Sequence, residues 1–216
     1  MASDATTARL ERMWPPQPPE AARVQRIIDG EVPVLHLERS VPTGTWPLVV
    51  DGLVERGFEL EFDELPRLGE RVRYIDLHCV WGWSSPGGRW RGIHIGDMAA
   101  LARPEDAVTH VLVSARSSPY ASCFTLAEAF DGVLAWELDG SPLPPERGGP
   151  LRFVPPSSKW AYKAVKWVER ITFLDAFRPG SWEERVGDPV GTVPWDVLQR
   201  FQIQVERWGS RCSTRT

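Results

Sequence analysis

Cysteine is scarce in this chain, and its distribution excludes several kinds of protein. The 216 residues include three cysteines, Cys79, Cys123 and Cys212, which form neither a CxxC pair nor an even-numbered framework of the kind that staples small secreted domains. The first residues lack the charged and apolar pattern of a secretory signal peptide. We therefore expect a cytoplasmic protein that works in a reducing compartment.

Long apolar runs and an excess of one charge are also missing. No run approaches the roughly 20 residues that cross a bilayer, and the net charge of −4 gives no reason to expect nucleic-acid or membrane-surface binding. The sequence contains no glycine-rich phosphate loop after a strand, no G-x-S-x-G nucleophile elbow and no His/Cys cluster at zinc spacing. These absences predict a globular domain without membrane insertion or a nucleic-acid partner.

Tryptophan and proline are abundant instead. Eleven tryptophans and twenty prolines predict extensive loops that are pinned by large aromatic side chains. Residues 1–30 include a proline-rich stretch at 14–19, which is either an extended arm that wraps the domain or a disordered tail. Because 42% of the residues are hydrophobic, we expect residues 31–216 to form one domain with a substantial core.

Hydrophobic periodicity predicts the α+β fold class, a mixed, β-rich domain with short helices. Alternating β-branched and aromatic residues predict strands at 48–50, 72–79, 111–114, 133–138 and 165–174, with a hairpin turn at Asp139-Gly140. A capping box of Thr125 and Glu128 predicts one short helix, and residues 95–102 predict another. From Pro194 onward a terminal helix is expected, with an apolar stripe that packs on the core, at positions 197, 198, 201, 205 and 208.

Cys79 lies at the end of one predicted strand, in the run Asp-Leu-His-Cys-Val-Trp-Gly-Trp-Ser at 76–84. Alternation along 72–79 puts Ile75, Leu77 and Cys79 on one face and His78 on the other. The thiol is either a small buried hydrophobe or a thiolate ligand or nucleophile. A Cys-His dyad is disfavoured, because neighbours on a strand point in opposite directions.

This run resembles the cysteine motif of the sulfite-oxidase family of molybdopterin-dependent oxidoreductases, approximately D-h-H-C-V-x-x-W-S followed by R-W-x-G. The second part is matched at residues 89–92, after a tryptophan- and glycine-rich stretch that we interpret as a turn. Residues 33–36 and 46–56 are similar to the family's first strand and turn, residues 143–152 to its L-P-P-E-x-G-G-P-L-R signature, and residues 162–167 to its Y-K-x-x-K-W block. Four blocks in the family's order cover residues 33–182.

The resemblance implies a molybdenum–molybdopterin cofactor (Moco), with Cys79 as the thiolate ligand of the metal. It also implies that Arg152 and the segment Ala164, Val165 and Lys166 contact the pterin and its phosphate, together with Lys163 as a cation of the same block. Arg147 stands where relatives often have a His or Asn that contacts the cofactor. Soft sulfur donors suit molybdenum, and a phosphate needs cations and backbone N–H groups.

Two histidines complete the candidate site. His36 aligns with a position near the metal, where an imidazole would donate a hydrogen bond to substrate; alternatively it caps an early turn. His78 either contacts the pterin or satisfies a backbone carbonyl. Trp81 and Trp83 either wall the metal pocket or pack in the core.

The leading interpretation is a single-domain molybdenum oxidoreductase that transfers an oxygen atom to or from a small substrate and exchanges electrons with a separate carrier. Residues 183–189 depart from the family's usual pattern where substrate access is expected, which argues against sulfite as the substrate. Two alternatives remain open. One is a non-catalytic domain that keeps the fold and the pterin, and the other is a cofactor-free interaction domain.

Overall fold

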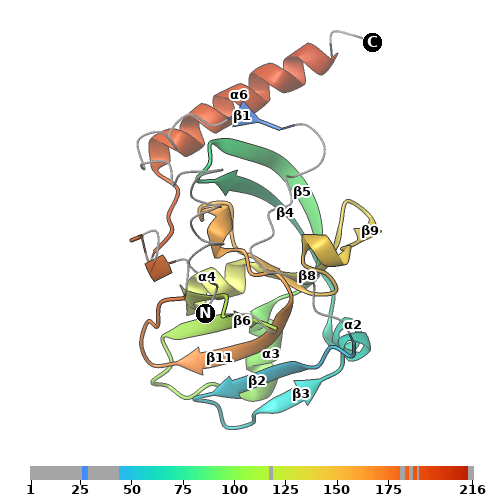
Figure 1. Ribbon diagram of the computed structural model, residues 1–216, viewed down its shortest axis with the longest axis vertical. Coiled ribbons are helices and arrows are strands. Elements are labelled where there is room, and N and C mark those ends of the chain that lie inside the picture. Colours follow the sequence, from blue (N-terminus) through green and yellow to red (C-terminus); the bar gives the residue numbers. More distant parts are fainter. Residues whose placement is uncertain are drawn as a thin grey trace, which may run out of the picture.

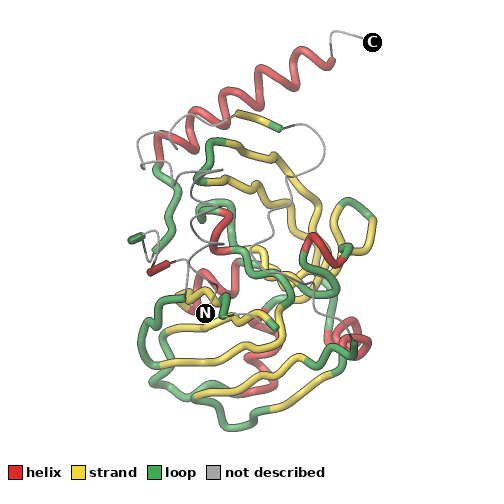
Figure 2. Tube along the Cα trace, in the orientation of Figure 1, coloured by secondary structure: helices red, strands yellow, loops and turns green. Residues whose placement is uncertain are grey.

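A computed structural model describes residues 26–28, 44–116, 119–180, 183–184, 187–188 and 190–213, with side chains up to residue 206. Strands dominate, and apart from the terminal helix the helices are short (Figure 2). The domain is therefore α+β, as the sequence predicts. Within these ranges no helix combines the length and apolar character needed to cross a membrane. The strands are β1 Arg26–Ile27, β2 Leu48–Gly52, β3 Phe58–Leu60, β4 Arg71–Cys79, β5 Trp83–Ile93, β6 His110–Ala115, β7 Ala121–Thr125, β8 Val133–Leu138, β9 Ser141–Pro142, β10 Arg152–Val154 and β11 Val168–Leu174. The helices are α2 Leu65–Leu68, α3 Ile95–Ala102, α4 Leu126–Asp131 and α6 Trp195–Ser213, with 3-10 turns η2 Phe62–Glu64, η3 Pro145–Arg147 and η4 Ala161–Lys163.

The strands form two sheets, which lie in the lower and upper parts of Figure 1. Sheet B has the order β3-β2-β11-β6-β7, and its β2 and β11 run parallel while its other pairs are antiparallel. Sheet A runs β1-β5-β8-β10, with β4 paired to β5 and β9 paired to β8. Chain segments that are distant in sequence are thus neighbours in both sheets.

Strand β5 corrects the interpretation of residues 83–92 as a turn. This stretch is the longest strand of the described chain and pairs with β1, β4 and β8. The Pro86-Gly87-Gly88 run is a bulge, because Ile75 faces Gly88 whereas Leu77 faces Ser85. Asp76 fills the bulge by accepting a hydrogen bond from the Gly87 N–H at 2.7 Å. Proline and glycine here mark an irregular strand rather than its end.

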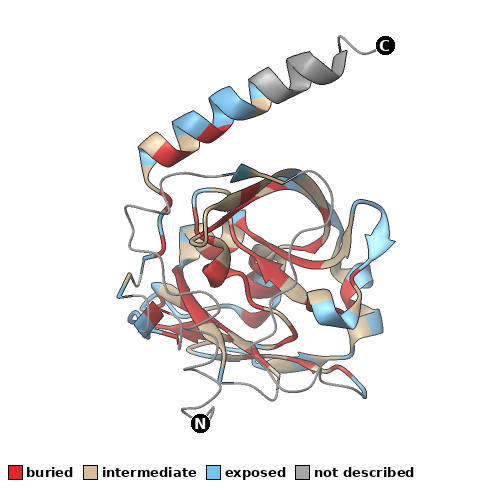
Figure 3. Cartoon of the chain, turned by 45° about the horizontal axis from the view of Figure 1, so that its top comes forward, coloured by how far each residue is buried: buried red, intermediate tan, exposed pale blue. Residues whose placement is uncertain are grey.

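Sheet A separates two hydrophobic clusters, because alternate side chains of its strands point to opposite faces. Leu134 of β8 and Phe153 of β10 belong to the larger core, which lies between sheets A and B. Their neighbours Ala135 and Val154 belong to a second cluster with Ile75, Leu77 and Trp90. Figure 3 shows buried residues on strands of both sheets. Sheet A therefore has a hydrophobic cluster on each of its two faces.

The two ends of the described chain meet at β5. Strand β1, from the predicted N-terminal arm, runs parallel to the start of β5, and α6 lies against β1. On α6, Val197 and Phe201 of the predicted stripe are buried and Leu198 is half-buried, which confirms its packing role, whereas the Trp208 side chain lies outside the described residues. The first turns of α6 form a third cluster with Trp160 and Val193.

Most of the predicted elements are present, with one clear shift. Helix α3 and strand β8 have the predicted bounds, the capping box of Thr125 and Glu128 opens α4, and Asp139-Gly140 forms the β8–β9 turn. Strand β11 begins three residues later than predicted. Trp167 has a left-handed φ of 54°, which interrupts the extended run before Val168.

Candidate functional site

Cys79 is the last residue of β4 and is held there by a tight turn. Its carbonyl accepts a hydrogen bond from the Gly82 N–H at 3.0 Å, and Gly82 has a φ of 83°, which favours glycine. The residue is 5% exposed. Burial raises the pKa of the thiol to about 12, against a lowering hydrogen bond from the Trp81 backbone. In this environment the sulfur is protonated at neutral pH, which argues further against a cysteine nucleophile.

Arg152 faces the same side of sheet A as Cys79. Cys79 follows Ile75 and Leu77 on one face of β4, and Arg152 is the cross-strand partner of Ala135 on β8. All three apolar residues belong to the second hydrophobic cluster. The thiol and the guanidinium therefore both border this cluster, although they are 73 positions apart in the sequence.

The guanidinium of Arg152 is poorly satisfied. Its Nη1 donates to the Arg147 carbonyl at 3.1 Å, and its Cζ lies 5.7 Å from the centre of the Trp90 ring. Its Nε is buried and has no hydrogen-bond partner among the described residues. The pKa of Arg152 is lowered to about 10, mainly by burial; Tyr120 acts to raise this pKa, and the nearby Arg147 charge acts to lower it. Two neighbouring cations and a buried unused donor form an environment that an anion would stabilise.

The family-like segment 164–166 lies beside this pair of arginines. Val165 exchanges backbone hydrogen bonds with Phe153, the residue after Arg152, at 2.8 and 3.1 Å. Lys166 donates from Nζ to the Glu146 carbonyl in η3 at 3.0 Å. The structure thus brings together Arg147, Arg152, Ala164, Val165 and Lys166, whereas their contact with a cofactor stays a prediction. Close packing requires glycine at 148, where a Cβ would lie 2.9 Å from the Lys166 Cβ.

His78 points to the opposite face of β4 from Cys79. It is fully buried; its Nδ1 lies 2.8 Å from the Ser84 Oγ and its ring meets the Phe201 ring edge-on at 4.7 Å. Its Nε2 is buried without a hydrogen-bond partner among the described residues. Burial lowers the pKa of His78 to about 4, although the Asp76 carboxylate raises it. Trp160 forms an isolated parallel bridge with His78 and joins this face to the segment that leads into η4.

Of the other candidate residues, one lies outside the described part of the chain and the rest form ion pairs. His36 lies outside the described residues, so its role stays a prediction. The side chain of Lys163 is buried and forms an ion pair with Glu183, as described below. Arg89 and Arg91, from the same motif as Trp90, both pair with Glu137 at 3.4 and 2.8 Å.

The residues present fit a molybdopterin. A pterin phosphate would pair with Arg152, whose Nε is buried without a partner among the described residues. No group of three or more His, Cys, Asp or Glu side chains among the described residues is arranged to hold a metal ion. A metal that arrives with its own dithiolene sulfurs would need a single protein ligand, and Cys79 could supply a soft one.

Comparison with known proteins identifies the family of this chain. The family model for the oxidoreductase molybdopterin binding domain matches residues 31–182, which include every block of the sequence resemblance. The chain therefore belongs to this family of sulfite-oxidase-type, molybdopterin-binding oxidoreductases, and it is an enzyme domain of that class. This membership argues against a purely structural or interaction role.

Two curated relatives show how far the similarity extends. The uncharacterized oxidoreductase YuiH of Bacillus subtilis is 34% identical over 158 residues, which are 72% of this chain and 78% of the relative. The protein-methionine-sulfoxide reductase catalytic subunit MsrP of Gluconobacter oxydans is 30% identical over 167 residues, or 68% of this chain. The alignment covers 52% of that MsrP, so the chain spans about half the length of such relatives.

A solved structure supports the fold. The sulfane dehydrogenase SoxCD from Paracoccus pantotrophus matches with a TM-score of 0.55 and 21% sequence identity, over 61% of this chain and 38% of that chain. At this identity the likeness concerns the fold alone. Ser84 belongs to the family-like motif, but its contact with His78 depends on the pairing of β4 with β5. Phe201 has no such pattern and reaches His78 only through the packing of α6.

Proposed function

We propose that this domain binds Moco with Cys79 as the metal ligand and catalyses oxygen-atom transfer at the sulfur of a small or peptide-borne substrate. The buried thiol of Cys79, on the same face of sheet A as the unsatisfied Arg152, carries the proposal. When bound, the cofactor supplies oxygen-atom exchange coupled to a two-electron redox change. The electrons are exchanged with a separate carrier.

The protein residues bind and orient the cofactor. Arg152 and Arg147 neutralise its phosphate, and the backbone and side chain of Ala164, Val165 and Lys166 line its pterin. His78 lies on the opposite face of β4, and its proposed contact is made where the strand ends after Cys79, with its Nε2 facing the polar edge of the ligand. His36 is proposed to hydrogen-bond the substrate. Cys79 would hold the metal as a thiolate, so its thiol proton would be released to solvent on binding.

The relatives named as methionine-sulfoxide reductases favour a sulfoxide as the substrate class. Reduction of one sulfoxide consumes two electrons and two protons and yields a sulfide and one water. Sulfite is disfavoured, since residues 183–189 depart from the family's usual sequence there.

Metal content and dye-linked turnover test the proposal. Protein from a molybdate-fed host should contain about one molybdenum per chain, because a single thiolate holds one cofactor. With reduced viologen as the electron donor, the loaded protein should reduce methionine sulfoxide, and with an oxidised dye it should leave sulfite unchanged. A wild-type protein that folds without molybdenum would remove the cofactor assignment, and a loaded protein inactive on sulfoxides would remove the substrate class.

Two serine substitutions locate the metal ligand. Cys79→Ser should give a folded protein that loses turnover, with changed metal spectra, since an oxygen ligand replaces a soft sulfur. Cys123→Ser is the matched control, because Cys123 is a second buried thiol, on β7, whose Sγ accepts from the Arg178 N–H at 3.4 Å. The control should keep the molybdenum spectrum of the wild type. Identical spectra for Cys79→Ser and the wild type would contradict the assignment.

A further inference from the structure

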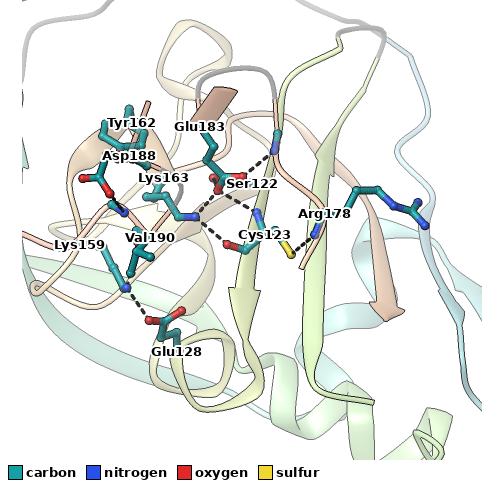
Figure 4. Close-up of polar contacts among 12 residues, drawn as sticks. Ser122, Cys123, Glu128, Lys159, Tyr162, Lys163, Arg178, Glu183, Asp188 and Val190 are labelled. Carbon is teal, nitrogen blue, oxygen red and sulfur yellow. Dashed lines mark hydrogen bonds and ion pairs between the residues drawn. The ribbon is translucent and has the colours of Figure 1, made fainter. Parts of the chain in front are cut away.

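A buried ion pair lies directly next to the proposed cofactor segment. Lys163 ends η4, one residue before Ala164, and its ammonium group pairs with the Glu183 carboxylate (Figure 4). The two side chains are 1% and 0% exposed. Lys163 Nζ also donates to the Cys123 carbonyl at 2.6 Å and lies 4.6 Å from the centre of the Phe124 ring. The pair therefore joins η4 to strand β7 of sheet B.

Glu183 is saturated with hydrogen-bond donors. Its Oε1 accepts from the Ser122 hydroxyl at 2.9 Å and the Cys123 N–H at 3.0 Å, and its Oε2 accepts from the Gly180 N–H at 2.5 Å. A carboxylate with these contacts and a lysine has a fixed position, because any displacement leaves buried donors unpaired. Glu183 therefore fixes the position of Lys163 and of η4, the turn that Lys163 ends.

The surroundings of Lys163 are closely packed on its other side. A Cβ at Gly191 would lie 2.7 Å from the Lys163 Cγ, and Gly191 has a φ of 64°, so glycine is required on both counts. The adjacent Tyr162 donates its hydroxyl proton to the Asp188 carbonyl at 2.7 Å. The residues just before Ala164 are consequently held from β7 and from the segment around residue 190.

A buried ion pair is an inefficient way to stabilise a fold, because apolar residues of similar volume often serve as well or better. A charged pair instead fixes the orientation of the lysine side chain and of the backbone that carries it, since the ammonium group must meet the carboxylate. We propose that Lys163 and Glu183 are positioning residues, which hold the peptide groups of Ala164, Val165 and Lys166 in the orientation that binds the molybdopterin. This inference rests on the cofactor proposed above.

Cofactor retention tests the inference without relying on turnover. Loaded wild type, Lys163→Met and the double variant Lys163→Met/Glu183→Gln are dialysed, and the molybdenum and pterin remaining per chain are followed over time. The double variant removes both charges, so it is expected to fold even where the single variant does not. We expect both variants to lose cofactor about ten- to hundredfold faster than the wild type, the range seen when residues that orient ligands are changed.

A control separates positioning from general loss of stability. Ile171→Ala removes a buried side chain of β11, in the centre of sheet B and five positions beyond Lys166 in the sequence. It should keep wild-type retention at temperatures where it is folded. In the unloaded proteins, amide hydrogen exchange over residues 161–166 should increase in the charge variants and stay at the wild-type level in the control.

Three outcomes are distinguishable. Wild type that never contains molybdenum contradicts the proposed function itself. Loaded wild type together with wild-type retention in the double variant contradicts the positioning role. Equally rapid loss in Ile171→Ala also contradicts it, because retention would then follow stability alone.

Discussion

Removing one partner of the Lys163–Glu183 pair should be costly to the unloaded domain. Lys163→Met leaves the Glu183 carboxylate buried without its cation, a change that typically costs about 3–5 kcal/mol. Three protein donors, from Ser122, Cys123 and Gly180, still solvate the carboxylate, and the methionine sulfur keeps a contact with the Phe124 ring. We therefore expect the low end, about 3 kcal/mol off the free energy of unfolding.

Urea unfolding at neutral pH measures this cost, and two further variants check its cause. Lys163→Met/Glu183→Gln should regain about half of the loss, since no net charge stays buried. Asp51→Asn, which breaks the half-exposed pair of Asp51 and Arg170 between β2 and β11, should cost less than about 1 kcal/mol. A single variant that costs under about 1 kcal/mol, or a double variant as unstable as the single one, would refute the reasoning from buried charge.

Burial, with Asp188 and Glu183 nearby, raises the pKa of Tyr162. Folding stability should therefore be full below about pH 10, the value for an unfolded tyrosine, and fall above it. Tyr162→Phe should show a smaller decline between pH 9 and 11 in urea titrations, and an equal decline would contradict this. Gly149→Ala should destabilise the domain by roughly several kcal/mol, because its Cβ would lie 1.9 Å from the Leu143 carbonyl oxygen. Gly96→Ala on α3 meets ordinary contacts and should stabilise the domain by about 0.5–1 kcal/mol. Thermal unfolding compares the two variants, and equal midpoints would be inconsistent with the packing described. Arg152→Met should change the stability of the unloaded domain by less than about 1 kcal/mol, since the lost hydrogen bond is offset by removal of a buried unpaired donor. The same variant should lose molybdenum on dialysis, and wild-type retention would argue against a role in binding.

Local patterns predicted the regular elements of the fold. Strand β8 and helix α3 have short-range signals, alternation in one and helical spacing between turns in the other, and both occur at the predicted bounds. Strand β5 was missed because its Pro86-Gly87-Gly88 run has turn chemistry, and the bulge that accommodates it depends on pairing with β4. The start of β11 depended on one left-handed residue, Trp167, whose conformation has no sequence signal.

The candidate site was predicted through motif order more than through physical pattern. The family membership and the enzyme class were confirmed by the comparisons, whereas the individual site residues, the boundary between arm and domain and the cytoplasmic location stay predictions. Glu183 could not be found from sequence, because it lies 20 positions from Lys163 in a stretch without periodicity. Only the tertiary fold brings such a partner to the cofactor segment.

Sheet A has a hydrophobic cluster on each face, and this arrangement affects how the domain unfolds. Leu134 and Ala135 are consecutive residues, yet each contributes to a different cluster, and the same holds for Phe153 and Val154. Neither cluster can lose its packing while sheet A remains folded against the other cluster. Heat or urea should hence unfold the domain in a single cooperative step. A ligand that binds against either face of sheet A should raise the melting temperature of the entire domain.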